Sequence, residues 1–199
     1  MLGLPAVTEV SKQLPKKAIY AKFDMNTAQR EKFDADVSRI TIVNEVSSST
    51  VNIVAGETVK AFFVLHLALK RREYDERLIV QLSRLIDQNM IFVLEYDGEA
   101  QLAVYHQKVM CTEWRSTDEL QIRLNGLTLD AVWENIITQI GGIHIESGHT
   151  LDEQIAIDER RDKLQKEIDK LEKLARKETQ PRKKLEIVQR INELLKDWR

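Results

Sequence analysis

A lysine and two glutamates are the residues of this sequence that could form a metal-dependent hydrolytic site. Lys70 closes a long apolar run, Glu45 precedes that run and Glu73 follows it. Carboxylates can hold Mg²⁺ while a lysine helps to orient or activate the attacking water. The residue two positions before Lys70 is Ala68, where an acid-x-Lys pair would need a carboxylate. The pattern is therefore incomplete.

The same loop, Lys70-Arg71-Arg72, has a simpler interpretation as the solvated end of a strand. A motif that lacks its required context is a weak hypothesis, so we favour this interpretation. We accordingly lean towards a protein without catalytic residues and without cofactors. Mg²⁺ enters only under the alternative, a degenerate or variant nuclease in which Glu45, Lys70 and Glu73 act.

Six basic residues and one acid lie between positions 173 and 184. Such a cluster could contact DNA phosphates, with an affinity that falls steeply as the salt concentration rises. It could also contact a partner protein, or simply solvate the end of a hairpin, because charge runs usually serve solubility. No aromatic residues interleave with the basic ones to stack on bases. The candidate contact residues are Lys173, Arg176, Lys177, Arg182, Lys183 and Lys184.

The four histidines do not indicate a metal site. His144 and His149 are five residues apart with Glu146 between them, and His66 and His106 lie on expected strands. This spacing matches no established zinc motif. Surface or packing positions explain these residues better, and we expect no bound metal.

The stretch from Val59 to His106 must position any site in the first part of the chain. Val59 to Leu69 is almost continuously apolar, which predicts a central strand covered on both faces. From Tyr74 to Asn89, leucines and isoleucines recur at three- and four-residue intervals and predict a helix. The runs 90–96 and 101–106, joined by a tight turn, predict a strand hairpin. The core is thus a strand, a crossover helix and two further strands.

The residues before this core predict an irregular opening followed by two helices. Leu4 to Leu14 has no clear periodicity. Pro15 is placed to open a short helix over 16–23, and Asn26 or Thr27 can cap the next helix.

Brief runs or alternations of apolar residues predict further strands at 38–46, 51–54, 108–115 and 120–124. After these strands, Thr128 is placed to cap a helix that Gly141-Gly142 stops. Together these elements indicate an α/β (α+β) domain with a mixed sheet over residues 1–148.

The tail, 149–199, changes to a highly charged composition with a regular apolar seam. Four- and three-residue spacings from Ile157 to Ala175 are typical of a short coiled coil with one polar interruption. Glu178-Thr179-Gln180-Pro181 breaks that helix, and the tail therefore predicts an antiparallel helical hairpin. The second helix carries Leu185, Val188, Ile191, Leu195 and Trp198.

The overall composition limits the class of protein. The chain has 199 residues, 43% of them apolar and 31% charged, and a net charge of −2, which gives no general reason to bind nucleic acid or an anionic membrane. Cys111 is the only cysteine, which excludes an internal disulfide and a multi-cysteine metal site. No segment approaches the roughly 20 apolar residues that span a bilayer. We expect a cytoplasmic protein that does not contact membranes.

Several sequence segments resemble a bacterial family of small proteins catalogued as a domain of unknown function. The resemblance runs nearly end to end, and its opening and its charged hairpin are the most specific parts. The segments that carry it are Met1-Leu2-Gly3-Leu4-Pro5, Thr8-Glu9-Val10, Thr50-Val51-Asn52-Ile53, Ile91-Phe92-Val93-Leu94, 124–129, 171–180 and 182–186.

This resemblance implies an association with bacterial DNA defence, because members are found beside genes for helicase-type ATPases and DNA methyltransferases. It supplies no catalytic residues. The order of helices and strands is also similar to that of restriction-endonuclease-like cores. Relatives tend to carry an acidic residue within the third strand, whereas this chain has the run from Phe62 to Leu69, which has none.

We therefore expect a non-catalytic accessory subunit of a defence or restriction–modification assembly. Its α/β body would dock a helicase-type ATPase or a DNA methyltransferase, and the hairpin would extend that interface or contact the DNA backbone, since apolar helical seams commonly pair with another helix. Self-association through the hairpin is a further possibility. The rival hypothesis is the Mg²⁺-dependent nuclease.

Overall fold

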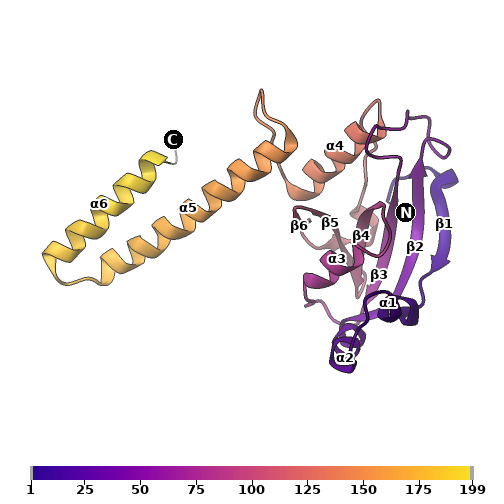
Figure 1. The fold of residues 1–199 in the computed structure, drawn as a ribbon, viewed down its shortest axis with the longest axis horizontal. Helices are drawn as coiled ribbons and strands as arrows, with labels where there is room; N and C mark the ends of the chain where they lie inside the picture. Colours follow the sequence, from indigo (N-terminus) through magenta and orange to yellow (C-terminus); the bar gives the residue numbers. More distant parts are fainter. Residues whose placement is uncertain (1, 198–199) are drawn as a thin grey trace. The chain divides into compact units, whose positions relative to one another are not determined.

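The computed structural model describes residues 2–197, so Trp198 lies outside the described residues. The chain divides into two compact units, Met1–Ile143 and His144–Arg199. The first is a mixed α/β body and the second is a pair of helices, which confirms the predicted fold class (Figure 1). None of the helices in the described chain is long and apolar enough to cross a membrane.

A mixed sheet forms the body. Its strands follow the order β1-β2-β3-β4-β5-β6, and β7 pairs with β5. Among the strands of the described residues, only β3 and β4 are parallel to each other, and β3 lies inside the sheet between β2 and β4, as its apolar sequence predicts. The strands are β1 (Glu9–Gln13), β2 (Val37–Ser47), β3 (Ala61–Leu69), β4 (Asn89–Tyr96), β5 (Glu99–His106), β6 (Lys108–Cys111) and β7 (Arg115–Ser116).

The described body has four α-helices, and two of them begin at a side chain that caps them. Asn26 and Gln29 form a reciprocal capping box, with each side chain 2.9 Å from the other's backbone nitrogen. Thr128 caps the last helix of the body, which ends at Gly142 in the left-handed conformation. These helices are α1 (Lys16–Lys22), α2 (Thr27–Asp36), α3 (Arg77–Leu82) and α4 (Leu129–Gly141).

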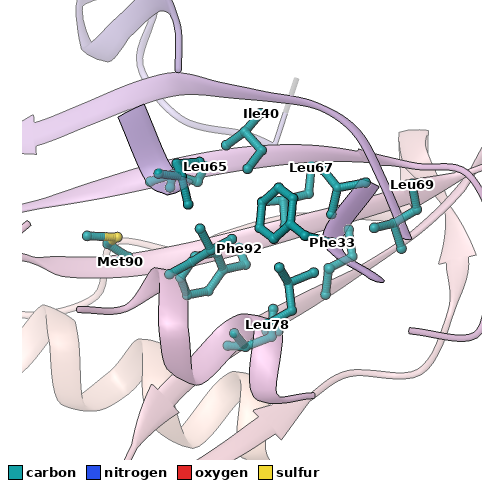
Figure 2. Packing of buried hydrophobic residues seen from close by; sticks show 14 of the residues in the cluster. Phe33, Ile40, Leu65, Leu67, Leu69, Leu78, Met90 and Phe92 are labelled. Atoms are coloured by element: carbon teal, nitrogen blue, oxygen red, sulfur yellow. The ribbon is translucent and has the colours of Figure 1, made fainter. Parts of the chain in front are cut away.

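One sheet face is buried under α1, α2 and α3, which all contribute to its core. Leu65 and Leu67 on β3 and Phe92 on β4 point into this core, where Phe33 of α2 and Leu78 of α3 meet them (Figure 2). On β3 and β4 every second residue contributes, because side chains alternate between the two faces.

Helix α4 packs on the opposite face, near the beginning of β3. The Trp133 ring lies 5.6 Å from the Phe62 ring, measured between centroids. Phe62 and Val64 are fully buried on this face, but His66 and Ala68 are only partly buried further along the strand. The second half of β3 is therefore partly open on the α4 side.

The prediction is wrong for the crossover helix and for the opening of the chain. The expected helix over 74–89 is only α3, six residues long, because the chain must leave the helix early to enter β4 at Asn89 in parallel register with Phe62. The segment from Leu4 to Leu14 contains β1, an edge strand whose largely exposed polar residues gave no apolar pattern.

Two further predicted strands are also absent from the described sheet. Val54 forms only an isolated bridge with Thr128 and is 68% exposed, so 51–54 is a connection. In 120–124 the apolar residues Leu120 and Ile122 are both buried, which explains the alternating sequence pattern. The segment nevertheless pairs with no strand of the described sheet, and the Ile122 N–H donates to the Leu2 carbonyl at 2.9 Å. The predicted 108–115 strand is divided into β6 and β7.

The second unit is the helical hairpin that the tail predicts. Helix α5 (Leu151–Lys177) packs against α6 (Pro181–Asp197), and the two run antiparallel (Figure 1). Ile168, Ala175 and Leu194 are buried in this unit. The Arg190 guanidinium lies 3.8 Å from the Glu167 carboxylate and links the two helices.

Candidate functional site

The partly open half of β3 carries a polar pair on the α4 side of the sheet. The imidazole of His66 hydrogen-bonds the carboxylate of Glu95 on β4. Their side chains are 18% and 37% exposed, so solvent reaches both. This pair lies towards the carboxyl ends of the two parallel strands, the region where ligands of open α/β sheets usually bind.

Arginines flank this pair across the strands. One row of directly paired residues crosses the sheet from β2 to β7 and has an arginine at each end. The row consists of Arg39 (β2), Ala68 (β3), Glu95 (β4), Ala100 (β5) and Arg115 (β7). Directly paired residues point to the same face, so both arginines share the face of Glu95. Adjacent strands are separated by about 4.8 Å, which puts the backbone of Arg115 about 10 Å from that of Glu95.

The predicted basic loop serves partly to hold the end of β3. The Arg71 Nε donates to the Asp36 carboxylate at 2.6 Å, and Asp36 is buried. Arg72 pairs with Glu99 at 2.9 Å and stacks over the Trp114 ring at 5.2 Å. The Lys70 side chain is exposed. Arg71 and Arg72 thus have structural partners, as the solvated strand-end interpretation allows.

The structure does not bring the nuclease candidates together. Glu45 pairs in register with Phe63, near the beginning of β3, and points to the face opposite Glu95. Lys70 lies seven residues beyond Phe63, roughly 23 Å away at 3.3 Å per residue. Glu73 follows in the exposed loop. Among the described residues, no group of three or more His, Cys, Asp or Glu side chains could hold a metal ion.

A groove of about 590 Å³ lies on the α4 side of the body, between β7, the 119–125 segment and α4. The groove is lined by Leu102 of β5, Thr112, Arg115 and Arg123, among other residues. Sequence reasoning missed these residues and Glu95. Leu102 is the register partner of Val93, which is the partner of His66, so this wall of the groove lies two strands from His66 and one strand from the strand of Glu95.

The hairpin turn does gather the predicted basic residues. All six are exposed, three at the end of α5 and three at the beginning of α6. Two pair within their own helix, Arg176 with Glu172 at 3.5 Å and Arg182 with Glu186 at 3.6 Å. The remaining four are Lys173, Lys177, Lys183 and Lys184.

Helix α6 also exposes apolar side chains outside its contact with α5. Leu185 is 58% exposed, Val188 is 39% exposed and Leu195 is 37% exposed, whereas Leu194 is 4% exposed. At 100° per residue, the three exposed residues fall on one stripe together with Asn192. We call Leu185, Val188, Asn192 and Leu195 the α6 stripe.

Comparison with protein families gives a match over nearly the whole chain. The family model, described as "Domain of unknown function (DUF4391)", covers residues 2–197. The chain belongs to this family. The DUF4391 match extends over the body and the hairpin alike, and it confirms the resemblance to a domain-of-unknown-function family. Neither the comparison with curated proteins nor that with solved structures gives a match.

Proposed function

We propose that this DUF4391 protein is a non-catalytic, cytoplasmic accessory subunit of a bacterial DNA defence or restriction–modification assembly. Its partner would be a helicase-type ATPase or a DNA methyltransferase, as the sequence resemblance implies. The observation that carries the proposal is the α6 stripe, an apolar surface on a helix whose other apolar side already packs on α5.

The spacing of the stripe suits helix pairing. Its members follow each other at intervals of three, four and three residues, the pattern of the a and d positions of a coiled coil. Asn192 takes one inner position, where a polar residue fixes register and partner choice at some loss of stability. Burying a leucine fully is worth roughly 1.5–3 kcal/mol, so covering this stripe would favour association.

Charged residues around the stripe restrict the partner. Arg182, Lys184 and Lys196 flank it, together with Gln189, and no acid lies among these flanking positions. A second copy of α6 would place like charges opposite each other, which is unfavourable. A partner helix with acidic flanks fits better, and the exposed lysines of the hairpin turn are then available to extend the contact to a DNA backbone.

The test is affinity purification of the tagged full chain from its native host, followed by mass spectrometry. The wild type is compared with a Leu185→Gln/Val188→Gln/Leu195→Gln variant, which removes the apolar surface without changing charge. A Glu186→Gln/Glu193→Gln variant, altered on the same helix outside the stripe, is the matched control. We expect the wild type and the control to retain an ATPase or a methyltransferase and the stripe variant to lose it.

Three results would contradict the proposal. The first two are recovery of no such partner by the wild type and equal recovery by the stripe variant. The third is a dimer in light scattering that the stripe variant converts to a monomer, which would assign the stripe to self-association instead. Circular dichroism of each variant checks that the hairpin remains helical.

A further inference from the structure

We propose that the groove between β7, the 119–125 segment and α4 binds phosphate groups through Arg115 and Arg123. The ligand class is a nucleotide or a nucleic acid strand, whose shared chemistry is a phosphate ester linked to a sugar and a base. This site lies in the body, within Met1–Ile143. It is independent of the docking that we propose for the α6 stripe.

The two guanidinium groups are the first reason. Arg115 and Arg123 line the same groove, and neither guanidinium forms an ion pair or a hydrogen bond within the part of the chain that the structure describes. By contrast, Arg71 and Arg72 are held by carboxylates. A planar guanidinium without a partner matches the geometry of a phosphate, to which it can donate two parallel hydrogen bonds.

The rigidity of the groove wall is the second reason. Side chains of α4 hold the 119–125 segment by its backbone: the Gln139 Nε2 donates to the Gln121 carbonyl at 2.7 Å, and the Asn135 Nδ2 donates to the Asn125 carbonyl at 3.0 Å. The Arg123 N–H donates in turn to the Gln139 Oε1 at 3.4 Å. The backbone that carries Arg123 is therefore fixed before any ligand arrives, which lowers the entropic cost of binding.

The size and the remaining lining of the groove narrow the ligand. A volume of about 590 Å³ falls within the range of small-molecule sites. Ile143 is partly exposed and supplies apolar surface for a sugar or a base, which a bare phosphate ion would not use, whereas Leu102 and Leu120 are buried in the groove wall. Glu119 lines the groove too, and its carboxylate would weaken the binding of an anion.

Binding to the full chain is measured with two probes that separate the sources of the phosphate. One is ADP, followed by titration calorimetry, and the other is a fluorescein-labelled oligothymidine of about 12 nucleotides, followed by anisotropy. We expect saturable binding of at least one probe. Arg115→Gln and Arg123→Gln should each weaken it about tenfold or more, because each removes a charged hydrogen bond. Glu119→Gln should strengthen it.

A control keeps the result specific to the groove. Arg77→Gln changes a highly exposed arginine on α3, outside the groove lining, and should leave the affinity unchanged. For the oligothymidine, each groove variant should also reduce the salt dependence, by about 0.7 in the slope of log K against log salt. Binding of neither probe, or binding that survives both groove substitutions in folded protein, would overturn the proposal.

Discussion

The imidazole of His66 and the carboxylate of Glu95 hydrogen-bond across the parallel strands β3 and β4. Both side chains are partly exposed, so water screens the interaction and its net contribution should be small. We expect His66→Gln and Glu95→Gln to lower the free energy of unfolding by less than about 1 kcal/mol each. Urea unfolding of the two variants and their combination measures the coupling between the residues, and a coupling of zero would contradict a formed pair.

Substitution of Gly56, which lies against the Asp130 carboxylate, should have a larger effect on stability. The Asp130 carboxylate accepts hydrogen bonds from the backbone of Glu57 and Val59, at 2.6 and 2.7 Å, and so holds that loop against α4. A Cβ at position 56 would lie only 2.2 Å from the Asp130 Oδ1. Gly56→Ala should therefore destabilise the body by about 1–3 kcal/mol through overpacking.

The control for this clash is the Asp130→Ala background. Without the carboxylate, Gly56→Ala should cost clearly less than in the wild type, and thermal unfolding of the four proteins makes the comparison. An equal cost in both backgrounds would show that the carboxylate is not what Gly56 avoids.

Cys111 should be an unreactive thiol. Burial raises the pKa of Cys111, although the nearby Tyr74 hydroxyl, 3.6 Å from the sulfur, acts in the opposite direction. Because the thiolate is the nucleophile, alkylation by iodoacetamide at pH 8 should be slower than that of glutathione by about tenfold or more. Alkylation in urea provides the reference for an accessible Cys111. A native rate equal to that of glutathione would contradict the prediction.

The elements that sequence reasoning located are those with a strong local signal. The apolar run of β3, the tight hairpin of β4 and β5 and the Thr128 cap of α4 are each encoded within a few residues. Strand β1 was missed because an edge strand exposes most of its side chains and needs no apolar pattern.

The candidate sites depend on register, which the sequence does not encode locally. His66 meets Glu95 only because the α3 crossover sets Ala68 opposite Glu95 in the parallel pair. Arg115 reaches their face through a strand of two residues, too short for any periodicity. The sequence indicated apolar residues at helical spacing in this segment, but the spacing of Leu185, Val188 and Leu195 alone did not tell which of them α5 would cover.

The hydrogen-bonded carboxylate of Asp34 should make the stability of the fold depend on pH. The Lys16 Nζ and the Tyr20 hydroxyl both donate to its Oδ1 at 2.6 Å, and these bonds lower the pKa of Asp34 from its ordinary value of 3.8. A carboxyl group whose pKa is lower in the folded than in the unfolded state stabilises the folded protein at pH values above its unfolded-state pKa. This contribution is lost as the pH falls through the folded-state pKa. Because Asp34 is 46% exposed, we expect less than about 1 kcal/mol. Urea unfolding of the wild type and Asp34→Asn should differ most above pH 3.8 and converge below it, and a difference that grows on acidification would refute this assignment.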